Sequence, residues 1–452
     1  MIVKNKSGIR WAIVGGGMLG LTLAHRMSKQ GHDVTLIEAA PELGGLASVW
    51  QLGNVTWDKH YHVTLLSDSR LRDLLEEIDL SDQLRWVETK TGFFTNGQMY
   101  SMSDTKEFLS FPPLSLIEKV RLGGTIFYAS KIRNWRRLEK TPVTKWLKRW
   151  SGKGTFEKIW LPLLRAKLGD AYKDTAASFI WATINRMYKA RRTGLKKEMF
   201  GYVVGGYRTV IQRMRDRITD QGVEILLSHP IRKVAKNGER FTVEFADQES
   251  RQFDRVIMTT PSPVVSRACV DLDQETKDKL DNIDYLGIVN ASILVDKPIS
   301  PYYVTNITDD WVPMTAVIEM TNIVDRAETD GKSLVYLPRY VPANHELFEK
   351  SDQEIEESFL TAIEKMHPHI SRDDISAFRI ARVRNVMAIP TLGYSETLPD
   401  QKTSVPGLFI VNSAYITKGN LNVNETIQIA EDALDGSLKD ALQQDQSLVA
   451  KS

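Results

Sequence analysis

A glycine-rich turn between two apolar runs is the feature that most constrains the fold of this chain. A mostly apolar run over residues 9–14 leads into Gly15-Gly16-Gly17-Met18-Leu19-Gly20, and a helical pattern follows. A second apolar run over residues 34–37 ends at Glu38. A strand, a Gly-x-Gly-x-x-Gly turn, a helix, a strand and an acid in this order predict a unit that binds a dinucleotide.

Each glycine of this unit has its own physical reason. Gly15 permits the tight turn, Gly17 has no Cβ to keep a pyrophosphate away from the backbone, and Gly20 lets the helix pack on the sheet. The helix N-terminus offers unpaired N–H groups and the positive end of its dipole to the phosphates. Glu38 is predicted to accept hydrogen bonds from the ribose hydroxyls of an adenosine.

A second glycine pair, Gly44-Gly45, follows shortly after Glu38. This spacing resembles the flavoprotein family of amine oxidases, protoporphyrinogen oxidases and phytoene-type desaturases. The resemblance implies that the cofactor is FAD and that the pair lies against the same pyrophosphate from the other side. A second Gly-x-Gly-x-x-Gly fingerprint does not occur further along the sequence, so a separate nicotinamide site has no support.

The resemblance extends from residue 9 to residue 434 and implies further contacts with FAD. The backbone near Ile231 would hold the adenine, and the N-terminus of the last helix, around Asn424, would face the flavin C2 carbonyl. The family's last nucleotide-domain strand usually ends in Ala-Gly-Asp, whereas here Asn412 stands at the glycine position and Ser413 at the position of the acid. Serine still donates and accepts hydrogen bonds, so FAD binding is expected to persist.

The order of patterns predicts an α/β protein, with a Rossmann-type FAD-binding domain and an interleaved α+β substrate domain. At 452 residues the chain is too long for one compact core. The FAD-binding domain is predicted to be discontinuous and the substrate domain to consist of a helical insertion and a β-sheet. The ranges are 1–90, 200–283 and 391–440 for the first, and 91–199 and 284–390 for the second.

Local signals add two expectations within the first hundred residues. Residues from about 64 to 90 are predicted to be helical, because their leucines recur at helical spacing. Asn96-Gly97 between apolar runs predicts a hairpin over residues 92–100.

The catalytic candidates are His60, His62 and Glu319. If residues 55–63 form a strand, Asp58, His60 and His62 share one face, and in the resembling family this region runs beside the flavin. A histidine there would orient substrate or move a proton; the alternative is a pair of hydrogen-bonded structural histidines. Glu319 would lie in the floor of the substrate site, or simply on a strand face. No metal site is predicted, because one flat strand rarely supplies a whole coordination shell.

Two features of the amine oxidases themselves are not found. The arginine that often follows the glycine pair is replaced by Leu46, and no lysine can be assigned to the flavin N5.

The charge of the chain is strongly asymmetric, although its net value is only +2. Residues 131–197 contain nineteen Lys or Arg against four Asp or Glu, with tryptophans and tyrosines interleaved. Such a region suits an anionic membrane surface or an anionic substrate, or it is a solvated helical face. Nucleic acid is not expected as a partner, because the dinucleotide fold already accounts for the phosphate chemistry.

The single cysteine, Cys269, excludes an intrachain disulfide and a cysteine-based metal cluster. Nowhere do eighteen apolar residues run together, so no transmembrane helix is predicted. The protein is therefore expected in the cytoplasm, either free or peripheral at the inner face of a membrane.

The predicted function is that of an FAD-dependent oxidoreductase that abstracts a hydride from a C–H or C–N bond. Porphyrinogen, polyene and amine remain open as substrate classes. The alternative is a non-redox flavin-dependent isomerase resembling UDP-galactopyranose mutase, whose anionic sugar nucleotide would suit the basic region. A flavin-binding scaffold without turnover is a third reading.

Overall fold

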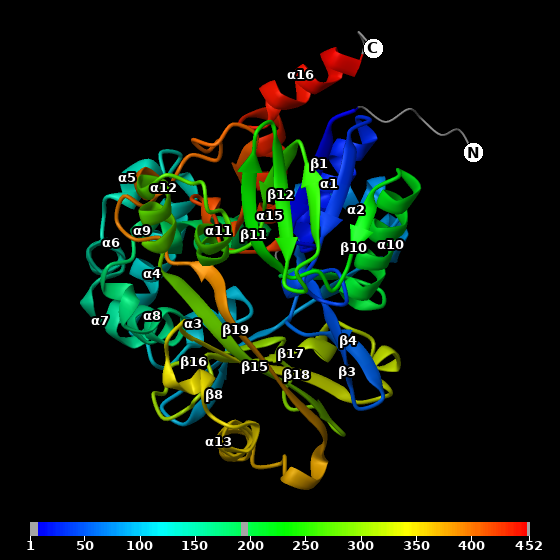
Figure 1. The fold of residues 1–452 in the computed structure, drawn as a ribbon. Coiled ribbons are helices and arrows are strands. Elements are labelled where there is room, and N and C mark those ends of the chain that lie inside the picture. The colour runs from blue at the N-terminus through cyan, green and yellow to red at the C-terminus, as the bar shows by residue number, and fades with distance from the viewer. Residues whose placement is uncertain (1–7, 191–197, 450–452) are drawn as a thin grey trace.

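The computed structural model describes residues 8–190 and 198–449, which form two halves (Figure 1). The upper half in Figure 1 is built around a parallel sheet and the lower half around a larger mixed sheet. A layer of helices lies along one flank of both halves. The observed architecture is therefore α/β, as the sequence predicts.

A five-stranded parallel sheet forms the centre of the upper half. Its strands come from widely separated parts of the chain and lie in the order β10-β2-β1-β14-β20. They are β1 (Arg10–Val14), β2 (Asp33–Ile37), β10 (Glu224–Leu226), β14 (Arg255–Met258) and β20 (Leu408–Ile410). After their first residues β1 and β2 are fully buried, which is typical of parallel strands covered on both faces.

Successive residues of β1 point into two different apolar clusters, one on each face of the sheet. Trp11 and Ile13 pack among helices, namely α1 (Met18–Lys29), α2 (Ser69–Glu77), α10 (Gly206–Asp220) and α15 (Val423–Asp435). Ala12 and Val14 pack against a small antiparallel sheet and its neighbours, namely β11 (Ile231–Asn237), β12 (Arg240–Phe245), β13 (Ser250–Phe253), α11 (Ser262–Ala268) and α12 (Gln274–Asp281). This alternation is the two-residue period of a strand.

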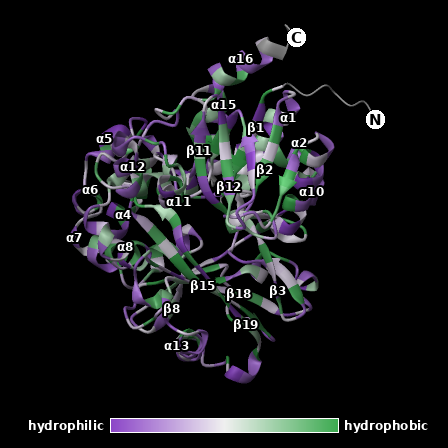
Figure 2. Ribbon diagram, viewed as in Figure 1, coloured by the Kyte–Doolittle hydropathy of each residue, from purple (hydrophilic) through white to green (hydrophobic). Residues whose placement is uncertain are grey.

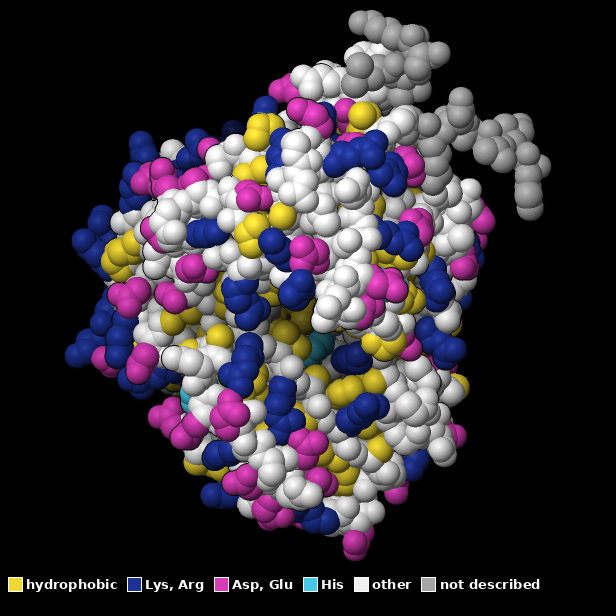
Figure 3. All heavy atoms as spheres, viewed as in Figure 1, with side chains coloured by type: hydrophobic (Ala, Val, Ile, Leu, Met, Phe, Trp, Pro, Cys, Tyr) yellow, Lys and Arg dark blue, Asp and Glu magenta, His cyan; other side chains and the backbone are white. Residues whose placement is uncertain are grey.

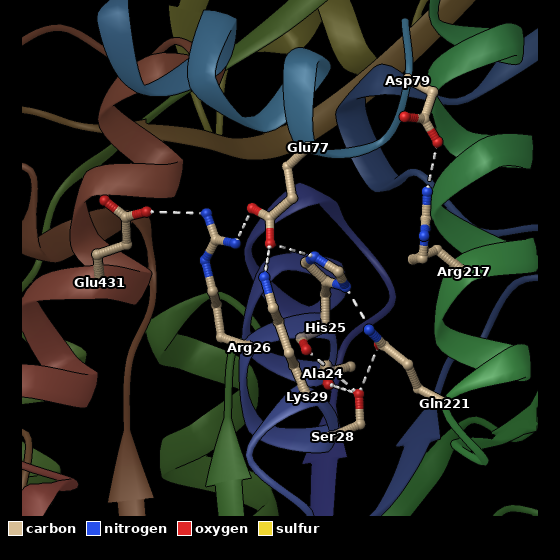
Figure 4. Close-up of polar contacts among 10 residues, drawn as sticks. All are labelled: Ala24, His25, Arg26, Ser28, Lys29, Glu77, Asp79, Arg217, Gln221 and Glu431. Atoms are coloured by element: carbon tan, nitrogen blue, oxygen red, sulfur yellow. Dashed lines mark hydrogen bonds and ion pairs between the residues drawn. The ribbon is translucent and has the colours of Figure 1, made fainter.

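A partly buried polar network ties the helices of the upper half together (Figure 4). Glu77 of α2 accepts hydrogen bonds from Arg26 and Lys29 of α1 and lies 3.2 Å from His25 Nε2, while Arg26 also reaches Glu431 of α15 at 3.1 Å. Burial alone would raise the pKa of Glu77, but the hydrogen bonds from Arg26 and Lys29 outweigh it and lower the pKa to about 2. The carboxylate therefore stays ionised and holds α1, α2 and α15 in one arrangement.

A seven-stranded mixed sheet forms the lower half, in the order β19-β15-β18-β17-β16-β7-β8. The strands are β7 (Thr91–Thr95), β8 (Gln98–Ser101), β15 (Tyr285–Val295), β16 (Val304–Ile307), β17 (Ala316–Glu319), β18 (Ser333–Pro342) and β19 (Ile375–Ala388). Odd-numbered residues of β15, from Val289 to Val295, pack with α13 (Asp352–Met366). On the other face, Asn290 donates to the carbonyl oxygen of Lys59 at 2.9 Å, so this face of the sheet meets the chain that follows the glycine pair.

Helices between Thr105 and Ala190 form the helical flank. They pack around one apolar cluster rich in tryptophan and phenylalanine. The helices are α3 (Thr105–Ser110), α4 (Leu116–Lys131), α5 (Arg136–Glu139), α6 (Val143–Ser151), α7 (Lys153–Thr155), α8 (Leu161–Leu168) and α9 (Ala177–Ala190). Figure 2 shows that hydrophilic and hydrophobic residues are mixed along these helices. The last part of the basic region, residues 191–197, lies outside the described residues.

Several local predictions can be compared with the structure. The hairpin is confirmed, with Asn96 and Gly97 both at positive φ between β7 and β8. The helix expected over residues 64–90 is found only as α2, from Ser69 to Glu77. Residues 64–65 form β5 (Thr64–Leu65) and residues 84–88 form β6 (Leu84–Glu88), and both strands pair with the distant β9 (Met199–Val203). A pairing partner more than a hundred residues away leaves no local signal for a strand.

The remaining elements are short or terminal. They are the hairpin β3 (Val49–Leu52) and β4 (Val55–Asp58), α14 (Tyr394–Thr397) and α16 (Lys439–Val449). Asp445 of α16 is buried and accepts a hydrogen bond from Trp11 Nε1 at 3.0 Å. Among the described helices, none combines the length and the apolar character that a bilayer crossing needs.

Candidate active site

Gly15 and Gly20 are required by the fold of the turn itself. Gly15 adopts a φ of 116°, and a Cβ built on it would lie 2.3 Å from Thr259 Oγ1. A Cβ on Gly20 would lie 1.9 Å from the carbonyl oxygen of Gly15, so only glycine lets the first turn of α1 rest on the end of β1. The amide of Gly15 donates to the carbonyl oxygen of Ile37 at 2.8 Å, which joins the turn to the end of β2.

Gly17, by contrast, meets no internal obstacle. Its φ of −73° suits any residue, and its Cβ would come no closer than 4.0 Å, to Gly45 Cα. The amide of Gly44 donates to the carbonyl oxygen of Gly16 at 2.8 Å, so the glycine pair lies directly against the turn. Helix α1 begins here with no side-chain cap and no acid in its first turn, which leaves its N–H groups available to an anion. The open space beside Gly17 fits the pyrophosphate of FAD.

Glu38 and Ile231 lie on neighbouring segments at the edge of this turn. Glu38 Oε2 accepts a hydrogen bond from the amide of Gly16 at 2.6 Å, and Oε1 accepts one from the amide of Ala40 at 2.8 Å. The carbonyl oxygen of Glu38 accepts from the amide of His229 at 2.9 Å, so the chain leading to Ile231 and β11 runs along the end of β2. Each carboxylate oxygen keeps a lone pair for a ribose hydroxyl.

Replacing Glu38 by alanine is expected to weaken FAD binding about tenfold, or ~1.4 kcal/mol, because the adenosine ribose loses its acceptors. Calorimetric titration of the apoprotein with FAD, ADP and FMN would measure the effect. Weaker binding of FAD and ADP with unchanged binding of FMN would place the carboxylate at the adenosine end. An unchanged affinity for FAD would contradict the assignment to the ribose.

Ser413 and Asn424 come from the segment that follows β20. Asn412 is buried, and its side chain donates to a backbone carbonyl at 2.9 Å and accepts from the amide of Ala414 at 3.0 Å. These bonds hold Ser413 at the start of a 3₁₀ turn, η9 (Ser413–Tyr415). Asn424 Oδ1 accepts from the amide of Arg70 at 3.0 Å, so this side chain caps α2. A contact of Asn424 with flavin would therefore have to come from the backbone at the start of α15.

His60 and His62 do not lie on a strand, because β4 ends at Asp58. Burial, followed by the charges of His62 and Lys59, lowers the pKa of His60 to about 3, so this ring is neutral at pH 7. His62 Nδ1 lies 3.8 Å from Asp58 Oδ2, beyond hydrogen-bond distance, and its ring centroid is 4.7 Å from that of Tyr207. A neutral His60 would orient substrate rather than act as a cationic acid.

Glu319 lies at the end of β17, and its carboxylate is hydrogen-bonded to a neighbouring segment of the chain. Its carboxylate is 2% exposed and accepts hydrogen bonds from the amides of Ile299 at 3.1 Å and Ser300 at 2.8 Å. Burial raises the pKa of Glu319. These contacts are those of a carboxylate that anchors a loop, and a catalytic role for it stays a prediction.

The structure brings a lysine and two tyrosines together, and sequence reasoning did not single out the lysine. Lys167 Nζ of α8 lies 3.1 Å from the centre of the Tyr340 ring, and the Tyr340 hydroxyl lies 2.9 Å from that of Tyr61. Burial lowers the pKa of Lys167 to about 7, so its charged and neutral forms coexist at neutral pH. Tyr340 packs against the same apolar cluster as Leu46 and Leu421, which come from the segments after the glycine pair and before α15.

The two halves of the molecule meet at a hollow on the face drawn in Figure 3. Hydrophobic side chains and a histidine lie at its floor, and lysine and arginine side chains stand around its edge. Within the described ranges 8–190 and 198–449, no group of three or more His, Cys, Asp or Glu could hold a metal ion.

Comparison with known proteins finds relatives at low identity over nearly the whole chain. The 15-cis-phytoene desaturase of Synechococcus elongatus is 19% identical over 442 residues, covering 89% of this chain and 90% of that protein. A structure from Exiguobacterium sp. 255-15, assigned as a protoporphyrinogen oxidase, superposes with a TM-score of 0.76 at 19% identity and covers 96% of this chain and 100% of its own. Reduced UDP-galactopyranose mutase superposes with a TM-score of 0.73 at 15% identity, covering 98% and 96%.

The family model for flavin-containing amine oxidoreductases matches residues 19–426. The matched range includes the glycine pair, the segment 228–231 and the start of α15, the parts that surround the turn at Gly17. The resemblance read from the sequence is thereby confirmed, and so is FAD as the cofactor. The chain belongs to the family of flavin-containing amine oxidoreductases and is an FAD-dependent oxidoreductase.

Proposed function

We propose that this enzyme removes a hydride from a C–H bond of a lipophilic substrate and a proton from the adjacent carbon, which leaves a double bond in the product. The observation that carries the proposal is the apolar wall near the glycine pair, where Leu46, Leu421 and Tyr340 pack against one cluster. Such a wall binds alkyl and ring carbon through the hydrophobic effect. The phytoene desaturase relatives favour the same substrate class, whereas a protonated amine would meet the like charge of Lys167.

The residues of the chain would act mainly by binding and positioning. Bound FAD supplies the hydride acceptor. The turn at Gly17 and the pair Gly44-Gly45 would hold its pyrophosphate, and the first turn of α15 would direct its positive dipole end at the ring system. The apolar wall would align the reacting C–H bond and exclude water. Lys167, with a pKa near 7, would hold or release a proton at Nζ.

Anaerobic visible absorption spectra of the purified protein would test this proposal. Candidate polyenes, porphyrinogens and amines are added in separate pools to the oxidised holoenzyme. We expect the flavin band to bleach with an apolar polyene or related hydrocarbon and to persist with amines. Bleaching by amines alone would overturn the substrate class, and bleaching by none of the three pools would overturn the oxidative reaction for these classes.

The basic edge of the hollow in Figure 3 favours a second candidate, a non-redox isomerase acting on an anionic sugar nucleotide. Like UDP-galactopyranose mutase, such an enzyme would need reduced flavin but would show no net electron transfer. Turnover of a UDP-sugar by the dithionite-reduced protein, with none by the oxidised protein, would support this candidate over the oxidoreductase reaction.

A further inference from the structure

Helix α4 (Leu116–Lys131) turns an apolar face outward. Leu116, Ile117, Val120 and Phe127 are 69%, 74%, 67% and 56% exposed, while Lys119 is only 8% exposed on the inward side. A surface helix normally buries its apolar stripe and exposes its charges. The exposed positions recur along one side of the helix over three turns, so they form one continuous strip about 18 Å long.

Two neighbouring segments extend this strip. Leu109 of α3 is 53% exposed and lies close by, because Lys119 Nζ donates to its carbonyl oxygen at 2.6 Å. On the other end, Tyr128 stacks on Trp150 of α6 with ring centroids 3.9 Å apart, and both rings are more than a third exposed. Together these side chains make a raised apolar patch with aromatic residues at one margin. We call it the α4 patch: Leu109, Leu116, Ile117, Val120, Phe127, Tyr128 and Trp150.

The surroundings of the α4 patch are strongly basic. Residues 116–153 contain eleven Lys or Arg and only two acids, Glu118 and Glu139. Glu118 pairs with Lys158 at 2.9 Å, and Glu139 is buried, so neither acid offers a free negative charge. In Figure 3, lysine and arginine side chains gather along the left edge of the molecule, where Figure 1 places α6 and α7.

We propose that the α4 patch is a docking surface for an anionic phospholipid bilayer. Its apolar strip would enter the acyl boundary, with Tyr128 and Trp150 at headgroup level and the surrounding basic residues on the lipid phosphates. A second copy of the chain does not fit as occupant, because a symmetric dimer would press two basic surfaces together. In the sequence, residues 131–197 are one candidate for membrane contact, beside an anionic substrate site or a solvated face; the proposal places the apolar part of the contact in α3 and α4, just before that region.

The position of the patch also suits delivery of a lipophilic substrate, an extension that rests on the proposed function. Leu122 and Ala129, on the inward side of α4, belong to the same apolar cluster that receives Leu46 and Tyr340. The layer between the proposed bilayer surface and the substrate wall is thus built from one cluster of helices.

Flotation of the FAD-loaded protein with vesicles tests the docking surface. The vesicles are phosphatidylcholine alone or phosphatidylcholine with added phosphatidylglycerol. We expect binding to the anionic vesicles that weakens with salt. The variant L116S/I117S/V120S/F127S is expected to bind at least about tenfold more weakly, with an unchanged flavin spectrum and melting temperature, because all four side chains are already exposed.

Two matched variants complete the test. V270S/L392S removes two other exposed apolar side chains, 40% and 44% exposed, and should bind as the wild type does. K145E/K148E should lower binding to anionic vesicles most at low salt. Equal binding by wild type and the four-serine variant, or no binding to either vesicle, would overturn the proposal, as would a dimer that the four-serine variant dissociates. Turnover of detergent-dispersed substrate tests the proposed reaction separately, because the α4 patch is not needed there.

Discussion

Valine in place of Gly17 is expected to abolish retention of FAD while the fold survives. The Cβ would meet no protein atom closer than 4.0 Å, and the extended backbone at this position accepts valine. The added carbons would instead fill the space beside Gly45 that the pyrophosphate needs. We expect the dissociation constant to rise at least about a hundredfold, or ~2.7 kcal/mol, measured by the flavin absorbance of the purified protein and by titration of the apoprotein.

Variants at two other glycines serve as controls that distinguish loss of the cofactor from loss of the fold. Gly20→Ala should lower stability itself, because its Cβ would lie 1.9 Å from the carbonyl oxygen of Gly15. Gly124→Ala in α4, where nothing lies within 4 Å of the added carbon, should not lower stability, because alanine is the better helix former, and should leave the flavin content unchanged. A Gly17→Val protein that purified fully loaded with FAD would contradict the assignment of the space beside Gly17 to the pyrophosphate.

Methionine in place of Arg186 is expected to give the largest loss of stability outside the glycine turn. Asp68, 2% exposed at the start of α2, receives two hydrogen bonds from Arg186 of α9, at 3.1 and 2.7 Å, and one from the amide of Leu65 at 2.8 Å. The pair joins the FAD half to the helical flank. Without Arg186 the carboxylate stays buried and unpaired, at a cost of about 3 kcal/mol, measured by urea unfolding of the loaded protein.

The double variant D68N/R186M should recover more than half of that loss, because a neutral amide replaces the unpaired charge. Lys140→Met, which breaks the exposed pair with Glu396, should have no measurable effect. Wild-type stability of Arg186→Met would show that the pair between the FAD half and the helical flank contributes nothing.

The cofactor half of this protein could be read from its sequence because its signals are local. The turn from Gly15 to Gly20, the acid at Glu38 and the pair Gly44-Gly45 all lie within about thirty residues of one another, and each residue type follows from backbone geometry that a short segment imposes. Even here, only the structure separates Gly20, which packing requires, from Gly17, which packing does not.

The other half depends on contacts between distant segments. The two loop amides that donate to the Glu319 carboxylate belong to Ile299 and Ser300, about twenty residues away, and no local pattern of the sequence predicts these contacts. No local sequence pattern distinguishes Lys167 from the other basic residues of 131–197. It lies beside Tyr340, which contacts Tyr61, only because α8, β18 and the chain after β4 pack together in the fold. The sequence pattern also could not show that α4 is turned with Ile117 outward, since periodicity gives the separation of two faces and not the direction in which each points.

The sequence by itself determined the α/β class, the FAD-binding turn and the family, because these rest on backbone requirements within one βαβ unit. Only the tertiary structure decided which polar groups are hydrogen-bonded within the protein, which lysine is buried beside a tyrosine, and which apolar helix face is exposed. The physical reason is that burial and pairing are properties of the whole folded chain. A side chain's desolvation and its partners are set by residues up to several hundred positions away.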